Sequence, residues 1–317
     1  MSYKSVWDFG RNGGTTNYSV HKIGEYPSKI RPIVFHEIVK RFSNIGDIIL
    51  DPFCGSGTLL VDAKILGRNS INYDINENAV NLSNTKLESL NLDEIKKTYD
   101  YFIMELNKEK ELIETKKLRQ IQIDKEIKKY EDLKKKILNL NTSHIIKKED
   151  ARYVKIIDDI IKIDLNKEYV DSIITDIPYS NMIKYSNLEN DLSTITDYNI
   201  FLEELNISFK NMISVLKKDG YCTIFVADYR ISASRKILPL HADVINLMRN
   251  LGMTLFDTFI WRYYRSGGFR PFGKRPFQAM NVHTYILVFH KPINEELNKS
   301  NRDVRYRKKL IEKIKKN

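Results

Sequence analysis

Short apolar runs alternate with stretches of helical periodicity in the first third of the chain. Residues 47–51 are expected to form a short buried strand and residues 70–74 a second strand, and each precedes a segment expected to be helical, 59–66 after the first and the residues from Asn76 onward after the second. Gly67 ends the first of these segments, as a left-handed cap would, and Asn76 begins the second, as an N-cap would. The order strand, loop, helix, strand, helix predicts the opening of a doubly wound α/β sheet.

The same alternation returns after residue 143. The predicted elements are strands at 143–146, 170–175 and 221–227, a helix at 201–216 that ends at residues 217–220, and a helix at 239–251 with Pro239 in its first turn. Two β-prone runs, 253–264 and 282–290, follow, and we expect them to pair as antiparallel strands on the sheet edge. The sequence therefore predicts an α/β fold, a doubly wound, Rossmann-like sheet with an antiparallel edge hairpin.

Between these two parts lies a long segment without Gly or Pro, from Gly67 to Pro178. Within it, apolar residues recur at helical spacing among Lys and Glu, at Ile123, Ile127, Tyr130, Leu133, Ile137 and Leu140. This spacing predicts one long amphipathic helix or a helical hairpin at residues 105–141. The insertion is either a solvated, coiled-coil-like excursion or an arm for a homodimer, a partner subunit or the target. The predicted domains are a discontinuous sheet domain at 1–104 and 142–292, this insertion, and a basic C-terminal tail at 293–317.

The charge balance points to a kind of partner. The chain carries a net charge of +11 and a sequence pI of about 9.3, which favours a polyanion, with nucleic acid first. A compositional bias toward Lys is the alternative explanation. Two cysteines without paired spacing, Cys54 and Cys222, and six scattered histidines argue against a disulfide framework and against a metal site. No apolar run is long enough for a bilayer and no signal peptide is evident, so we expect no membrane partner and a cytoplasmic location.

A glycine-containing loop and acidic strand ends form the candidate binding site. Asp51, Asp74 and Asp150 stand at or near the ends of predicted strands, and doubly wound sheets bind ligands beyond these carboxyl ends. Gly55 and Gly57 lie in the loop after the first acid, where they allow backbone to approach a ligand closely. An acid placed like Asp74 accepts hydrogen bonds from ribose hydroxyls. The site is therefore expected to hold an adenosine-like ligand.

The composition of this loop narrows the choice of ligand. D-P-F-C-G-S-G-T is neither the G-x-G-x-x-G fingerprint of nicotinamide cofactors nor the G-K-[ST] loop of NTPases. It contains no Lys or Arg that would face a pyrophosphate. S-adenosylmethionine carries no phosphate and has a cationic sulfonium, so a loop rimmed by acids suits it.

Two motifs give a resemblance to a known family. Residues 51–58 are similar to the cofactor motif of DNA amino-methyltransferases, and Asp176-Ile177-Pro178-Tyr179 resembles their catalytic D-P-P-Y. With the upstream segment 26–32, they resemble the N6-adenine/N4-cytosine class over residues 18–90 and 143–290. The resemblance implies a Rossmann-like methyltransferase fold and S-adenosyl-L-methionine as cofactor. The cofactor-binding residues that it implies are Asp51, Pro52, Phe53, Gly55, Ser56, Gly57, Thr58, Asp74, Ile75, Asp150 and Ala151, with Lys29 or Arg31 as the partner of the cofactor's carboxylate.

The same resemblance assigns the chemistry to four residues. An exocyclic amine is a poor nucleophile because its lone pair is delocalised, so the Asp176 carboxylate would take one amine hydrogen and the Ile177 carbonyl the other. Pro178 would hold the turn, and Tyr179 would stack on a base that has left the duplex. Position 177 usually holds Pro in this family, so the Ile leaves the turn less constrained. The acid at position 176 favours adenine N6 over cytosine N4.

A basic and aromatic segment between the last two strands is the predicted nucleic-acid contact. Within residues 265–281, cations alternate with phenylalanines at Arg265, Phe269, Arg270, Phe272, Lys274 and Arg275, a pattern suited to phosphates and bases of DNA. The alternative is a hairpin tip whose Phe side chains pack on the sheet. Asp228, Tyr229 and Arg230 follow a predicted strand and would line the base pocket or form a structural ion pair.

Three other functions compete with DNA methylation. An RNA methyltransferase acting on guanine N2 of tRNA would carry similar motifs. A non-catalytic methyltransferase-like subunit would bind nucleic acid without reaction, and a small-molecule methyltransferase would share the fold. The intact Asp176, Pro178 and Tyr179 argue against loss of catalysis, and the basic charge argues against a small substrate.

Overall fold

The central element of the fold is an eight-stranded sheet in the order β1-β9-β10-β6-β5-β2-β3-β4. The computed structural model describes residues 5–9, 19–27, 30–113, 117–136, 141–180, 185–230, 236–262 and 283–293. The strands of the sheet are β1 (Val6–Asp8), β2 (Ile48–Asp51), β3 (Asn69–Asp74), β4 (His144–Lys148), β5 (Val170–Asp176), β6 (Leu216–Val226), β9 (Thr254–Arg262) and β10 (His283–His290). A separate two-stranded ribbon pairs β7 (Tyr229–Arg230) with β8 (Ile237–Leu238).

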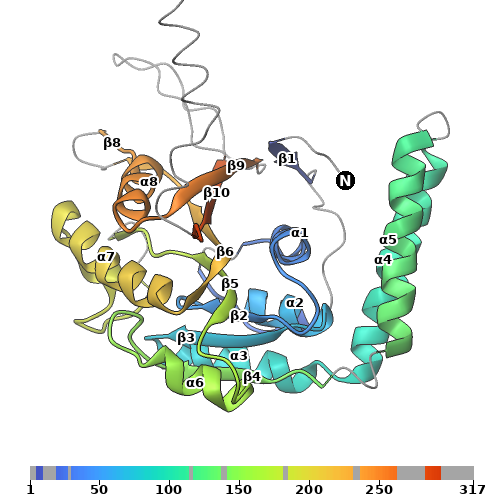
Figure 1. Cartoon of the computed structure of the whole chain (residues 1–317), viewed down its shortest axis with the longest axis horizontal. Helices are drawn as coiled ribbons and strands as arrows, with labels where there is room; N and C mark the ends of the chain where they lie inside the picture. Colours follow the sequence, from blue (N-terminus) through green and yellow to red (C-terminus); the bar gives the residue numbers. More distant parts are fainter. Residues whose placement is uncertain are drawn as a thin grey trace, which may run out of the picture.

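Helices cover both faces of this sheet (Figure 1). They are α1 (Pro32–Phe42), α2 (Thr58–Ile65), α3 (Glu77–Ser89), α4 (Leu92–Glu111), α5 (Lys117–Lys136), α6 (Ile156–Ile163), α7 (Tyr198–Ser214) and α8 (Leu240–Asn250). Side chains of a strand alternate between faces, so Ile49 belongs to the buried cluster of α1 and α2, whereas Ile48 and Leu50 belong to that of α6, α7 and α8. The parallel order β6-β5-β2-β3-β4, covered on both sides, confirms the predicted doubly wound α/β fold.

The last two long strands pair antiparallel as predicted, but they do not form the edge of the sheet. β10 lies inside, between β9 and β6, and is antiparallel to both. β1 adds in parallel to the outer side of β9, with Trp7 opposite Trp261. The predicted edge position of the hairpin was wrong because β1 lies outside it. With only three residues, β1 is too short to be recognised as a strand from its sequence pattern. A tertiary contact stabilises β1: the buried Trp7 ring packs on Phe259, with ring centroids 4.8 Å apart.

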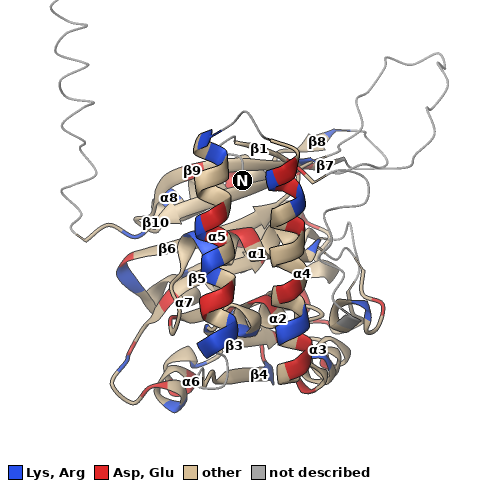
Figure 2. Cartoon of the chain, turned by 90° about the vertical axis from the view of Figure 1, so that its right-hand side faces the viewer, with Lys and Arg blue, Asp and Glu red and all other residues tan. Residues whose placement is uncertain are grey.

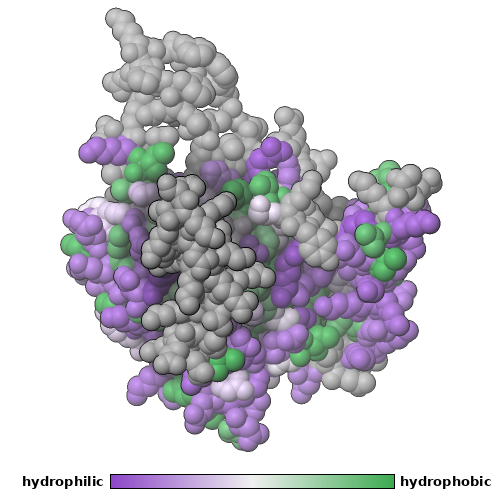
Figure 3. All heavy atoms as spheres, turned by 45° about the horizontal axis from the view of Figure 1, so that its top comes forward, coloured by the Kyte–Doolittle hydropathy of each residue, from purple (hydrophilic) through white to green (hydrophobic). Residues whose placement is uncertain are grey.

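The helical insertion is a hairpin of α4 and α5, and it starts at Leu92, before the predicted residue 105. The hairpin is not a solvated excursion, because Phe102, Tyr130 and Leu133 on its inner side are buried in one cluster with side chains of α1 and α2. The Tyr99 hydroxyl also donates a hydrogen bond to the carbonyl of Ile65 at the end of α2. Its outer sides mix Lys and Arg with Asp and Glu (Figure 2), and its visible surface is largely hydrophilic (Figure 3).

One further local prediction differs from the structure, and two helices were not predicted. Residues 217–220 do not end a helix but lie inside β6, at a break in its register with β5, which pairs with Leu216 and then again from Tyr221 onward. No helix was predicted at the positions of α1 and α6, although both bury apolar side chains on the sheet. No helix within the described part of the chain combines the length and the apolar character that crossing a bilayer requires.

Candidate active site

One pocket lies where several strand ends meet. It opens beyond the carboxyl ends of β2, β3 and β5 and beside the residues that follow β4, and it encloses about 840 Å³ including space open to solvent. Two motifs that are distant in sequence, the glycine loop and the D-I-P-Y turn, therefore share one cavity. The predicted residues that line it are Asp51, Pro52, Phe53, Gly55, Ser56, Thr58, Asp74, Ile75, Asp150, Ala151, Asp176, Ile177 and Pro178.

The loop between β2 and α2 is folded tightly by its own backbone. Gly57 N–H donates to the Cys54 carbonyl at 2.9 Å, and Gly55 and Gly57 adopt positive φ angles of 50° and 70°. A Cβ on Gly55 would lie 2.9 Å from the ring of Tyr26, in the pocket wall. A Cβ on Gly57 would lie 2.6 Å from the Ser83 hydroxyl, so this glycine lets α2 pack on α3 and does not line the pocket.

Asp74, at the end of β3, fastens this loop to the start of α3. Its carboxylate accepts hydrogen bonds from the backbone N–H groups of Gly55 at 2.9 Å and Asn76 at 2.8 Å. Burial raises the pKa of Asp74 to about 6, although both bonds favour the charged form. A carboxylate has about four acceptor positions, so two backbone donors leave capacity for ligand hydroxyls.

Asp51, at the end of β2, lies under the loop and connects it to β5. The Thr175 hydroxyl donates to its Oδ1 at 2.7 Å, and the Phe53 N–H donates to the same oxygen at 3.3 Å. Asp51 is almost fully buried, and this burial raises its pKa to about 7. The carboxyl group therefore holds two neighbouring strand ends in register at the floor of the pocket.

Asp176 and Tyr179, in the turn after β5, form a bonded pair. The Tyr179 hydroxyl donates to Asp176 Oδ1 at 2.7 Å. Burial raises the pKa of Asp176 to about 8, the Tyr179 bond opposes this rise, and the nearby Asp51 adds to it. Asp176, Ile177 and Pro178 line the pocket, whereas the buried Tyr179 does not. The phenol therefore orients the carboxylate, a role that the motif alone did not suggest.

Asp150, which follows β4, is held by a cation two residues away. The Arg152 guanidinium donates to both Asp150 oxygens, at 2.9 Å from Nε and 2.5 Å from Nη2. The same guanidinium binds Glu204 at 2.5 Å and the carbonyl of Asn190 at 2.7 Å. Ala151 also lines the pocket, and its carbonyl accepts from Asn211 of α7 at 2.9 Å. Arg152, which fixes this wall to two other segments, belongs to none of the motifs recognised in the sequence.

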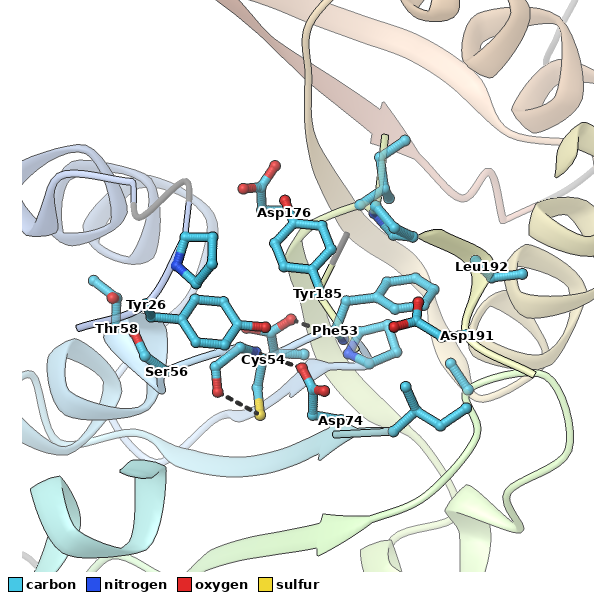
Figure 4. A pocket seen from close by; sticks show the side chains of 18 of the residues that line it. Tyr26, Phe53, Cys54, Ser56, Thr58, Asp74, Asp176, Tyr185, Asp191 and Leu192 are labelled. Atoms are coloured by element: carbon cyan, nitrogen blue, oxygen red, sulfur yellow. Dashed lines mark hydrogen bonds between the residues drawn. The ribbon is translucent and has the colours of Figure 1, made fainter. Parts of the chain in front are cut away.

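Two tyrosines and an acid that the sequence analysis did not select complete the pocket. Tyr26 and Tyr185 line it with nearly parallel rings, whose centroids are 5.9 Å apart, and Asp191 lines it beside them. Burial, with the charge of Asp74 next, raises the pKa of Tyr26. In the close-up, Asp74 and Asp176 lie at opposite ends of the pocket and the labelled aromatic rings lie between them (Figure 4). Tyr26 stands within the segment that carried the family resemblance, but Tyr185 and Asp191 follow no motif.

The remaining predicted residues lie elsewhere. Arg31 is the N-cap residue of α1 and does not line the pocket, and Lys29 lies outside the described residues. The predicted nucleic-acid contacts, Arg265, Phe269, Arg270, Phe272, Lys274 and Arg275, also lie outside the described residues. Within the part of the chain that the structure describes, no three His, Cys, Asp or Glu side chains gather closely enough to hold a metal ion.

Comparison with known families places the chain. The N6/N4 methyltransferase family described as DNA methylase matches residues 1–85 and 170–317, which is more than half of the chain. The chain belongs to this family of DNA methylases. The family takes its methyl group from S-adenosylmethionine, in agreement with the cofactor that the glycine loop predicted. The segment between the two matched parts contains the α4–α5 hairpin.

Individual relatives of the chain include methyltransferases of two kinds. It is 40% identical over 92 residues to the type II methyltransferase M.MjaII of Methanocaldococcus jannaschii, covering 29% of this chain and 17% of that protein. It is 28% identical over 198 residues to a probable tRNA (guanine(10)-N2)-dimethyltransferase of Methanothermococcus thermolithotrophicus, covering 62% of this chain and 79% of that protein. The chain thus spans only a small part of the first relative and most of the second.

Among solved structures, a SAM-dependent methyltransferase from Methanosarcina mazei aligns with this chain at a TM-score of 0.44 and 13% identity. The alignment covers 81% of this chain and 98% of that one.

Proposed function

We propose that the protein transfers the methyl group of S-adenosylmethionine to an exocyclic amino group of a base in DNA. The observation that carries this proposal is the single pocket formed by the glycine loop, the acid at the end of β3 and the D-I-P-Y turn. When bound, S-adenosylmethionine supplies an electrophilic methyl group on a sulfonium.

The charges that line the pocket fit a cationic ligand without phosphate. Its described lining contains six acids and neither Lys nor Arg, the acids being Asp51, Asp74, Glu149, Asp150, Asp176 and Asp191. Burial raises the pKa values of Asp51, Asp74 and Asp176, because their surroundings stabilise negative charge poorly. A bound cation would relieve that cost, whereas a pyrophosphate would increase it. Asp74 would accept hydrogen bonds from the ribose hydroxyls.

At the other end of the pocket, the turn after β5 would hold the amine that receives the methyl group. The Asp176 carboxylate accepts one amine hydrogen and the Ile177 carbonyl accepts the other, which directs the nitrogen lone pair toward the methyl group. Asp176 also stabilises the positive charge that develops on the nitrogen. Tyr179 holds the carboxylate in place through its 2.7 Å hydrogen bond.

Base extrusion and a preference for adenine are further parts of the proposal. An exocyclic amine inside a duplex is paired and stacked, so the target nucleotide must turn out of the helix to reach a pocket. The carboxylate at position 176, in place of a hydroxyl, supports adenine N6 over cytosine N4.

Mapping of modified bases tests the proposal directly. Unmethylated genomic DNA is incubated with the protein and S-adenosylmethionine, and modified bases are located by single-molecule sequencing. We expect N6-methyladenine at one recurring short sequence. The Asp176→Ala variant is expected to leave no modification while binding S-adenosylhomocysteine as the wild type does. Absence of modified bases after treatment with the wild type would contradict the proposed reaction.

Methylation of guanine N2 in tRNA is the second candidate. It is favoured by the relative named for that reaction, which matches 62% of this chain and is itself covered over 79% of its length. In a parallel reaction, total tRNA replaces DNA and the nucleosides are analysed by mass spectrometry. N2-methylguanosine in tRNA together with unmodified DNA would transfer the assignment to RNA.

A further inference from the structure

A partly exposed imidazole stack lies outside the pocket, at the carboxyl end of β6. His241, in the first turn of α8, directs Nδ1 to the Asp228 carboxylate at 2.7 and 2.8 Å. Its ring lies nearly parallel on Tyr285 of β10, with centroids 4.1 Å apart and planes 14° apart. Tyr285 in turn meets the ring of His283 edge-on at 4.8 Å. Three elements thus fix one imidazole.

The register of the sheet places this stack beside the D-I-P-Y turn. Asp176 of β5 is paired with Phe225 of β6, and the next residue, Val226, is paired with Tyr285. Asp228 therefore stands just past the end of the strand that neighbours the turn. A side-chain hydrogen bond joins Tyr229 to Ser180, the residue that follows the turn. The stack and the proposed amine site are consequently parts of one edge of the sheet.

The arrangement leaves one nitrogen of the imidazole available. Asp228 accepts from both Nδ1–H and the backbone N–H of His241, the latter at 3.1 Å, so its charge is compensated on one side of the ring. Nε2 lies on the opposite side of the ring, and no residue in the described ranges bonds it. The His241 side chain is 27% exposed. Capping α8 needs only the carboxylate, so helix capping does not explain a stacked and oriented imidazole.

We propose that His241 binds, through Nε2, a backbone phosphate of the DNA strand that carries the target base. This inference rests on the proposed function. Extrusion of a base rotates its backbone, so a contact at the flanking phosphate is needed to hold the strand over the turn. An imidazolium fixed by Asp228 donates a charge-assisted hydrogen bond to such a phosphate. The stack also lies next, along the chain, to the basic segment 265–281, because β10 begins at His283.

The chain contains a matched control for this contact. His290 Nε2 pairs with Asp219 at 2.7 Å, and its ring lies 5.2 Å from that of Tyr221. This second pair is built on the same strands, β6 and β10, but at their opposite ends. His290→Ala therefore removes an equivalent imidazole–carboxylate pair far from the turn.

The test compares His241→Ala, His241→Gln and His290→Ala. Methylation of unmethylated genomic DNA gives KM, and fluorescence anisotropy of a labelled duplex at several salt concentrations gives the affinity. For His241→Ala we expect KM for DNA to rise about tenfold and the slope of log affinity against log salt to fall by about 0.9, which corresponds to one lost phosphate contact. For His241→Gln we expect a smaller rise in KM, because the amide can still donate a hydrogen bond. The salt slope should remain lowered, because the amide is neutral. His290→Ala should change neither value.

Failure of the phosphate contact and failure of the proposed function give different results in this experiment. Affinity for S-adenosylhomocysteine and the melting temperature should be unchanged in His241→Ala, which shows that the pocket and the fold are intact. If the wild type methylates DNA and His241→Ala behaves like His290→Ala, the phosphate contact is wrong and the proposed function stands. If the wild type does not modify DNA, both are wrong.

Discussion

The hydroxyl of Tyr179 donates a hydrogen bond to Asp176 at 2.7 Å, within a turn of four residues. This bond opposes the rise in the pKa of Asp176 that burial causes. An ionised carboxylate accepts an amine hydrogen more strongly than a protonated carboxyl group does, so the phenol increases the fraction of Asp176 that is in the more effective form at neutral pH. The acid and the phenol of this turn are therefore linked electrostatically.

Removing that hydroxyl should shift the pH profile. In Tyr179→Phe the ring remains, but the bond that favours the charged form is lost, so the pKa of Asp176 should rise above about 8. We expect kcat at pH 7.5 to fall roughly tenfold, the size of one hydrogen bond of about 1.4 kcal/mol, and to recover partly at higher pH. Initial rates at saturating DNA and cofactor across pH 6–9.5 measure the shift. Tyr229→Phe, which removes a hydroxyl bonded to Ser180 instead, serves as control, and an equal shift in both variants would contradict this explanation.

Neutralising Asp176 should stabilise the protein at high pH. The folded-state pKa of about 8 lies above the ordinary value of 3.8, so the folded state is disfavoured progressively as pH rises from about 4 to 8. Asp176→Asn has no such dependence and retains an oxygen for the Tyr179 hydroxyl. We expect the melting temperature of Asp176→Asn to exceed that of the wild type, and the excess to be larger at pH 9 than at pH 5. Each kcal/mol of difference in the free energy of unfolding corresponds to ~2–4 °C.

Calorimetric melts without cofactor measure this difference. The exposed Asp257 on β9 provides the control, since Asp257→Asn should alter the melting temperature little at either pH. A constant offset between Asp176→Asn and the wild type at pH 5 and pH 9 would show that ionisation of this carboxyl is not opposed by the fold.

The sequence was sufficient for the parts of the molecule that local pattern determines. The glycine loop, the acids at 51, 74 and 176 and the doubly wound order follow from runs of apolar residues and turn chemistry, and the structure gathers these acids in one pocket. Contacts between residues that are distant in sequence could not be predicted from it. Tyr185 stacks on Tyr26, although the two residues are far apart in sequence. The short strand β1 is stabilised by packing of Trp7 on Phe259. Helical periodicity at 123–133 was evident, but it did not show which surface the hairpin would meet.

The α4–α5 hairpin should contribute to the stability of the whole molecule. The Tyr130 hydroxyl donates to Nε2 of His36 at 2.7 Å, and Nδ1 of His36 pairs with Asp62 at 3.0 Å, all three being buried. Burial lowers the pKa of His36, so the imidazole is neutral, donating from Nδ1 and accepting at Nε2. In Tyr130→Phe the buried Nε2 loses its donor, and we expect the free energy of unfolding to fall by about 1–3 kcal/mol.

Urea unfolding followed by circular dichroism tests this prediction. Lys134→Met provides the control within the same helix, because it removes only the exposed ion pair with Asp100 and should change stability by less than about 1 kcal/mol. Equal midpoints for Tyr130→Phe and the wild type would mean that the hairpin unfolds independently of the sheet.

The close approach of Gly55 to Tyr26 should make the glycine loop intolerant of a single methyl group. Gly55 has a φ of 50°, and a Cβ there would lie 2.9 Å from the Tyr26 ring, which is itself stacked on Tyr185. Gly55→Ala must therefore push the ring or the loop into the pocket, and we expect affinity for S-adenosylhomocysteine to fall at least about tenfold, or ~1.4 kcal/mol. Gly46→Ala separates this effect from backbone strain, because Gly46 has a φ of 85° but no atom within 4 Å of the added Cβ. Both variants should lose roughly 1–2 kcal/mol of stability from the left-handed conformation, and only Gly55→Ala should lose affinity in calorimetric titration. Equal affinities in the two variants would show that Tyr26 does not form part of the cofactor's binding surface.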